Sequence, residues 1–125
     1  ENIPASPEIL TTDTGIRIGV WIMPNNEAKG MFETFLNSIV PGDEESQKLL
    51  SYTNSVVAKS RDHGADFKDD HIDKAKIYTW LALKNPPGTS YHLALQKRIL
   101  DPTSPSAEAF VKWFCELFEL ELSGS

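Results

Sequence analysis

Apolar residues alternate with period two only at the start of this 125-residue chain, and from residue 30 onward they recur at helical spacings of three and four. The alternating part consists of two runs, 9–12 and 16–23, on either side of a turn at 13–15. This pattern predicts two strands joined by a glycine-containing loop. Apolar residues on both faces near the end of the second run predict a strand covered on both sides, and Gly19 predicts a close backbone approach. The chain is therefore expected to form one short strand pair followed by helices.

Five stretches after the strand pair carry apolar residues on one helical face. They lie at 31–40, 44–60, 72–83 and 90–100, and the last begins with Ser104 as N-cap and Pro105 at the first helical position. The predicted fold class is α+β and mostly helical, with one short β-hairpin or strand pair followed by four to five helices. We divide the chain into an extended lead-in at 1–8, a single compact domain at 9–122 and a tail at 123–125. The aromatic side chains expected to be largely buried are Trp21, Phe35, Trp80, Phe110, Trp113 and Phe114.

The charge of the chain argues against broad contact with nucleic acid. Acidic residues outnumber basic ones by 18 to 12, for a net charge of −6, whereas binding to a phosphate backbone requires clustered Lys and Arg.

Cys115 is the single cysteine and cannot form an intrachain disulfide. No apolar run approaches the ~20 residues that span a bilayer. We therefore expect a cytoplasmic protein without membrane contact.

Glu33 follows the second predicted strand, where its carboxylate has two interpretations. Ligands of open α/β sheets gather beyond the carboxyl ends of strands, and a carboxylate there could hold a hard cation such as Mg²⁺. Alternatively, Gly30 as N-cap with Glu33 three residues later resembles a capping box, and the helix dipole favours an acidic side chain in a first turn. Spacing alone favours the cap.

Lys74 lies in the first turn of the helix predicted at 72–83, a position that lysines usually avoid. An exposed ion pair with Asp70, which is also the expected N-cap of this helix, is the simpler interpretation. A lysine directed at a phosphate is the alternative. The acidic residues before this helix, together with His63 and His71, fit no established metal-ligand spacing, so we predict no metal cluster there.

Three segments carry an ordered set of motifs. Gly-Val-Trp-Ile-Met-Pro-Asn-Asn at 19–26 is followed by Gly-Met-Phe-Glu at 30–33. Lys-Ala-Lys-Ile-Tyr-Thr-Trp-Leu-Ala at 74–82 precedes a Pro-Gly pair, and an aromatic helix at 110–118 closes the set. In this order the segments resemble a bacterial family of unknown function that is grouped with the Toprim-like proteins. The resemblance extends over roughly 16–118.

The resemblance implies that the chain is the C-terminal half of a longer Toprim-like α/β protein, whose first half supplies another Glu and an Asp-x-Asp pair. In that protein Glu33 would be a metal ligand and Lys74 a cation beside the phosphate, both facing one cleft. The complete protein would be a Mg²⁺-dependent phosphodiester enzyme acting on nucleic acid, while this chain alone would hold no cofactor and be inactive. Asn25 replaces the family's usual Asp, which weakens the metal site, and His92 replaces a usual Gly.

The other predicted function is a noncatalytic helical interaction module. A Toprim-like half lacks the strands that would flank its own strand, and its last helix carries more large apolar side chains than one face needs. The expected partner is a second copy of the chain or the missing N-terminal half. Contact with a homodimer partner is expected through the strand edge, the last helix or an exchanged N-terminal segment.

Overall fold

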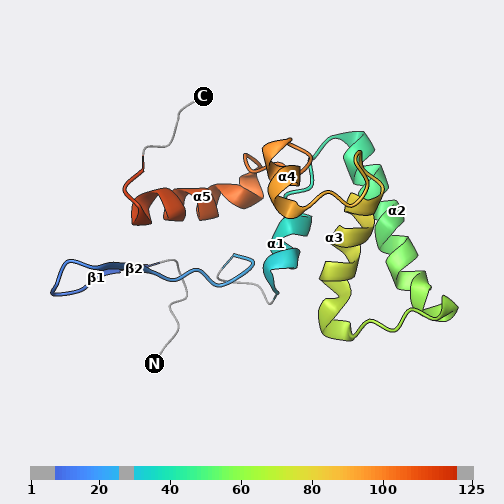
Figure 1. The fold of residues 1–125 in the computed structure, drawn as a ribbon, viewed down its shortest axis with the longest axis horizontal. Coiled ribbons are helices and arrows are strands. Elements are labelled where there is room, and N and C mark those ends of the chain that lie inside the picture. The colour runs from blue at the N-terminus through green and yellow to red at the C-terminus, as the bar shows by residue number, and fades with distance from the viewer. Residues whose placement is uncertain (1–7, 26–29, 121–125) are drawn as a thin grey trace.

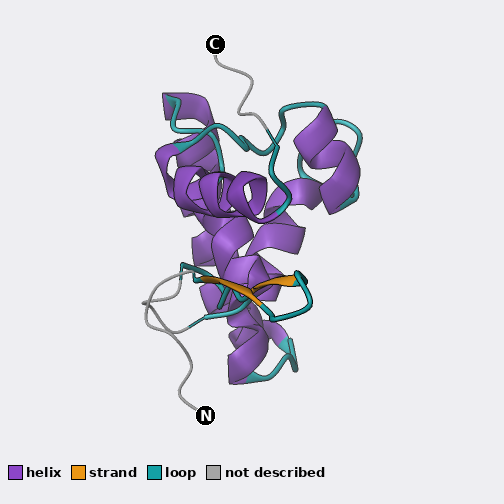
Figure 2. Cartoon of the chain, turned by 90° about the vertical axis from the view of Figure 1, so that its left-hand side faces the viewer, coloured by secondary structure: helices purple, strands orange, loops and turns teal. Residues whose placement is uncertain are grey.

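The computed structural model describes residues 8–25 and 30–120, and this part is α+β and mostly helical (Figures 1 and 2). An antiparallel hairpin of β1 (Ile9–Thr11) and β2 (Arg17–Gly19) comes first. The helices that follow are α1 (Phe32–Ser38), α2 (Glu44–Ser60), α3 (Ile72–Ala82), α4 (Tyr91–Gln96) and α5 (Pro105–Leu117). Two short 3-10 turns, Arg61–His63 and Asp69–His71, connect α2 to α3. The predicted fold class is confirmed, while lead-in residues 1–7 and the tail lie outside the described residues.

The core of the helical body is centred on α3, which contacts both α1 and α2 (Figure 1). Trp80 is fully buried, and Ile77 and Leu81, three residues before and one after it, are buried with it. Burying side chains of this size contributes about 1.5–3 kcal/mol each, so α3 accounts for much of the stability of the body. The other buried apolar residues of this core are Phe35, Leu36, Ile39, Val40, Ala94, Leu100 and Ala107.

Helix α4 ends at Gln96, earlier than the predicted end at residue 100. The backbone of Arg98 is left-handed, with φ of 60°. The N–H groups of Ile99 and Leu100 both donate to the carbonyl oxygen of Ala94, at 2.8 and 3.0 Å. This turn provides hydrogen-bond donors for a carbonyl group at the end of the helix. It also places the Leu100 side chain in the core, although Leu100 lies beyond the helix.

The hairpin lies along α5, away from the helical body (Figures 1 and 2). The Arg17 guanidinium donates to the carbonyl oxygens of Glu116 (2.7 Å) and Leu117 (3.2 Å), at the negative end of the helix dipole. A Cβ atom on Gly19 would lie 2.8 Å from side-chain atoms of both Trp113 and Leu117. The predicted close approach at Gly19 is therefore confirmed, and the neighbour is α5.

Only one face of β2 is covered, so the predicted strand with two covered faces is wrong. The strand ends at Gly19, and the next residue, Val20, is 43% exposed. Arg17 and Gly19 face α5, whereas the alternate residues Ile16 and Ile18 are exposed. The described residues supply no further element on that second face.

The prediction that Phe114 is largely buried is also wrong, since its side chain is 41% exposed. Phe110 of α5 packs against Phe35 of α1, with ring centroids 5.5 Å apart, and Trp113 of α5 packs against the hairpin. The Phe114 ring lies near the rings of Phe110 and Phe118, with centroids 6.2 and 4.7 Å away. Phe35 and Trp80 are buried as predicted, and the remaining three aromatic residues of the predicted set are half-buried.

None of the helices in the described residues combines the length and the apolar character that crossing a bilayer requires.

Candidate functional site

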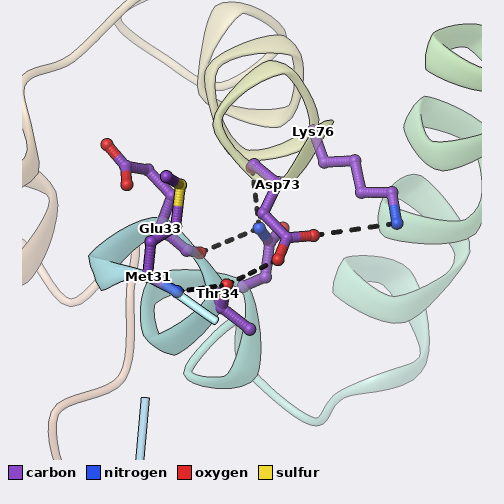
Figure 3. A network of polar contacts seen from close by, with 6 residues as sticks. Met31, Glu33, Thr34, Asp73 and Lys76 are labelled. Atoms are coloured by element: carbon purple, nitrogen blue, oxygen red, sulfur yellow. Dashed lines mark hydrogen bonds and ion pairs between the residues drawn. The ribbon is translucent and has the colours of Figure 1, made fainter. Parts of the chain in front are cut away.

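A polar network holds the first turn of α1 against the first turn of α3 (Figure 3). The Thr34 hydroxyl donates to Asp73 Oδ2 at 2.5 Å and accepts from the Met31 backbone N–H at 2.9 Å. Asn37 Nδ2 donates to the backbone carbonyl oxygens of Glu33 and Asp73, both at 2.9 Å. These bonds fix the relative position of the two helix starts that carry Glu33 and Lys74.

The cap of α1 is made by Thr34, so the capping role expected for Glu33 is wrong. The N-cap is Met31, one residue after the expected Gly30, and its N–H is satisfied by the Thr34 hydroxyl. The Glu33 carboxylate takes no part in this cap, and Figure 3 shows it pointing away from the contact between Thr34 and Asp73. Glu33 is half-buried, and its side chain has no hydrogen bond or ion pair within the described residues.

Lys74 is exposed and pairs with a tyrosine ring instead of Asp70. Its Nζ lies 5.9 Å from the ring centroid of Tyr78, four residues later on α3, within the range of a cation–π contact. Asp70 belongs to the preceding 3-10 turn, and the N-cap of α3 is His71, which makes no side-chain cap bond. Both the expected ion pair and the expected N-cap are therefore wrong: the turn before α3 places Asp70 outside the helix.

Tyr78 of α3 and Tyr91 of α4 face each other with ring centroids 5.4 Å apart. Burial raises the pKa of Tyr91 above the usual tyrosine value, and the neighbouring Tyr78 phenol and the charge of Glu33 act in the same direction. The Tyr91 hydroxyl oxygen is buried and has no hydrogen-bond partner in the described part of the chain. The raised pKa keeps this phenol protonated at neutral pH.

Glu33, Lys74, Tyr78 and Tyr91 form one surface, here called the tyrosine-pair surface. It joins α1, α3 and α4, because Lys74 contacts one tyrosine and the charge of Glu33 acts on the other. The surface offers a carboxylate, an ammonium group and the exposed ring of Tyr78, while the hydroxyl of Tyr91 is buried. Such a set can hold an anionic group at the ammonium.

In the part of the chain that the structure describes, the acidic side chains do not gather into a metal-binding cluster. Within the described residues there is no group of three or more His, Cys, Asp and Glu side chains that could bind one. Glu33 supplies one carboxylate, whereas Mg²⁺ sites use one or two carboxylates together with substrate phosphates and waters. The Asp73 carboxylate is already an acceptor for Thr34 and lies on the other side of the first turn of α1.

Sequence reasoning missed both tyrosines and the Thr34–Asp73 contact. The spacing of four residues between Lys74 and Tyr78 is a signal that could have revealed their contact on one helix face. No comparable signal connects Tyr91 to Glu33, or Thr34 to Asp73, because these pairs come from different helices. Asn25, the departure from the family motif, is an exposed residue in the turn after β2, and Asn26 lies outside the described residues.

Comparison with known proteins identifies one family. The family model described as Protein of unknown function (DUF3226) matches residues 1–119. No curated protein and no solved structure gives a significant match.

Proposed function

This chain belongs to the DUF3226 family, and we propose that it is the C-terminal half of a bacterial Toprim-like protein. In the complete protein, the tyrosine-pair surface contributes Glu33 and Lys74 to a Mg²⁺-dependent site that acts on phosphodiester bonds of nucleic acid. The proposal combines the motif order of the sequence with the position of these two residues. The chain alone is inactive.

The observation that supports this proposal is the meeting of Glu33 and Lys74 at one pair of tyrosines. They lie on different helices, and neither side chain has an ion pair within the described residues. In the proposed role, Lys74 binds a phosphate oxygen. Glu33 contributes one of several oxygen ligands.

The same geometry supports the proposal that this half is inactive alone. One carboxylate leaves most of the ligands of a cation unassigned, and the net charge of −6 repels a phosphate backbone. The remaining carboxylates and the basic surface must come from residues outside this sequence.

A nuclear magnetic resonance titration with Mg²⁺ and the dinucleotide dTpdT tests the proposal on the purified chain. We expect weak binding, with amide shifts at Glu33, Lys74 and Tyr91 and no cleavage. Lys74→Gln should weaken dTpdT binding several-fold, because one phosphate contact is lost, and Glu33→Gln should remove the Mg²⁺-dependent shifts. Lys112→Gln is the matched control, since Lys112 is an exposed lysine on α5.

Two results would overturn the proposal. The first is a set of amide shifts that lie outside the tyrosine-pair surface, or that are the same in Lys74→Gln and Lys112→Gln. The other is Mg²⁺-dependent cleavage of nucleic acid by the purified chain, which would show that the half is complete in itself.

A second candidate function, the noncatalytic interaction module, is favoured by the outer hairpin face. This face consists of Leu10, Ile16, Ile18 and Val20, and Leu10 and Ile18 are cross-strand partners. All four are exposed, between 43% and 61%. Isolated two-stranded hairpins are marginally stable in water, and an apolar face of this kind usually marks an interaction site.

The occupant that we propose for the outer hairpin face is a second copy of this chain. The face contains no charged residue. Two copies can therefore meet through it without placing like charges opposite one another, although each copy has a net charge of −6. A twofold axis also allows one self-complementary surface to serve both partners. The basic residue of the hairpin, Arg17, is directed to the opposite side, at α5.

Sedimentation velocity at micromolar concentration tests this pairing. We expect the parent chain to sediment as a dimer and Ile18→Lys as a monomer, since the lysine would desolvate its charge in the interface. Leu83→Lys is the matched control, because Leu83 is similarly exposed at the end of α3, away from the hairpin. A monomeric parent, or a dimer that persists in Ile18→Lys, would exclude the outer hairpin face as the dimer interface.

A further inference from the structure

Three aromatic rings from three different helices contact one another in a series, here called the aromatic row. The Tyr91 ring of α4 contacts both of the others. Its centroid lies 5.9 Å from that of Phe32 on α1 and 5.4 Å from that of Tyr78 on α3. The aromatic row therefore extends the tyrosine-pair surface onto the first residue of α1.

Two members of the aromatic row are exposed to solvent. Phe32 is 41% exposed and Tyr78 is 51% exposed, whereas Tyr91 is half-buried and its hydroxyl oxygen is covered. Single exposed apolar residues are common on protein surfaces, but two exposed rings joined through a third form a contiguous aromatic patch. A positive charge accompanies this patch, because the Lys74 ammonium lies 5.9 Å from the centroid of the Tyr78 ring.

Exposed aromatic rings beside a lysine favour single-stranded over double-stranded nucleic acid. The bases of a single strand can pack on aromatic side chains while a cationic side chain contacts the backbone. In a duplex the base faces are already stacked on one another, so binding depends mainly on charge. The net charge of −6 opposes that second mode, and Lys74 is the one cation of the tyrosine-pair surface.

We propose that the aromatic row binds single-stranded nucleic acid, with bases packed against Phe32 and Tyr78 and a backbone phosphate at Lys74. This inference rests on the proposed function, because it names the form of nucleic acid that the tyrosine-pair surface takes. Packing on the rings supplies affinity without additional positive charge. The buried hydroxyl of Tyr91 makes no contact with the strand, and its ring supports the two exposed rings.

The test compares three probes on the purified chain in the presence of Mg²⁺. They are a twelve-nucleotide thymidine strand, an abasic strand with the same backbone, and a GC-rich duplex of twelve base pairs. Affinities are measured by fluorescence anisotropy of the labelled probes. We expect the thymidine strand to bind about tenfold more tightly than the abasic strand, because only its bases can pack on the rings. It should also bind several-fold more tightly than the duplex.

Two variants assign the stacking contacts. Phe32→Leu and Tyr78→Leu should each remove most of the preference for the thymidine strand over the abasic strand, because leucine is apolar but has no ring face. Phe118→Leu is the matched control: Phe118 is 58% exposed and does not belong to the aromatic row, so the preference should remain. A preference that persists in both Phe32→Leu and Tyr78→Leu would overturn the inference.

The measurements on the parent chain decide the inference without depending on the folding of any leucine variant. Equal affinity for the thymidine and abasic strands would overturn it. If that equal affinity fell in Lys74→Gln, the proposed function would stand and only the packing of bases on the rings would be excluded. No binding of any of the three probes would overturn both the inference and the proposed function.

Discussion

The Thr34 hydroxyl donates to the Asp73 carboxylate at 2.5 Å, and this bond joins the first turns of α1 and α3. It orients the two helix starts from which Glu33 and Lys74 extend. The tyrosine-pair surface therefore depends on a contact that contains neither of its charged residues.

Thr34→Val should destabilise the chain by about 1–3 kcal/mol, because valine keeps the shape of threonine but leaves the Asp73 oxygen without its donor. A thermal melt is expected to shift by several degrees. The matched control is Thr103→Val, which removes a similar hydroxyl bond to Asp101 (2.6 Å) on the exposed surface and should have a much smaller effect. Equal losses in the two variants would contradict a special role of the part-buried Thr34–Asp73 contact.

Gly19→Ala should weaken the attachment of the hairpin to α5. The new methyl group would lie 2.8 Å from atoms of Trp113 and Leu117, and overpacking of this kind costs about 1–3 kcal/mol. Thermal unfolding and the fluorescence of the tryptophans beside Gly19 measure the effect. Gly42→Ala is the control, since a Cβ atom there meets nothing within 4 Å. An unchanged melt in Gly19→Ala would show that the hairpin does not pack on α5 in solution.

The N-cap of α2 should make stability depend on pH in the acidic range. The Asp43 carboxylate accepts the Ser46 backbone N–H at 3.0 Å, and this bond lowers the pKa of Asp43 below 3.8. Because the pKa is lowered in the folded state, the stabilisation by the Asp43 carboxylate is present above pH 3.8. It is lost as the pH falls through the pKa of the folded state. Asp43→Asn, which caps without a charge, should lose less stability on acidification than the parent, as urea unfolding would show. Asp43→Ala should be destabilised at every pH; if it matched the parent, the cap would be unimportant.

Tyr91 should ionise at a higher pH than an ordinary tyrosine. Burial raises the pKa of Tyr91 in the folded chain above the ordinary tyrosine value of 10.0. The resulting contribution to stability is present below pH 10 and is lost as the pH rises toward the pKa of the folded state. An absorbance titration should show one delayed tyrosine that ionises together with alkaline unfolding.

Tyr91→Phe should abolish this delayed step and leave stability at neutral pH within about 0.5 kcal/mol, because the hydroxyl that it removes has no partner. Tyr52→Phe, at an exposed position on α2, should keep the delayed step. A large loss of stability in Tyr91→Phe would instead reveal a hydrogen bond to the phenol.

Local patterns in the sequence determined the elements of this protein. The predicted helix at 44–60 coincides with α2, and Ser104 with Pro105 begins α5 as expected. The hairpin forms around Gly15, whose φ is 85°, a value that glycine adopts at no steric cost. These features are encoded within a few residues, because capping, turn geometry and periodicity act between near neighbours in the chain.

Only the tertiary structure decided which faces are covered and which polar groups meet. Val20 and Phe114 are apolar, but their exposure depends on where α5 lies relative to the hairpin. Thr34 reaches Asp73, and the charge of Glu33 acts on Tyr91, across helices that are distant in sequence. The periodicity of the sequence does not predict such pairs, because they form only when α1, α3 and α4 pack against one another. The sequence alone thus indicated Glu33 and Lys74 as candidates, whereas the packing of these helices determined that they share a surface with two tyrosines.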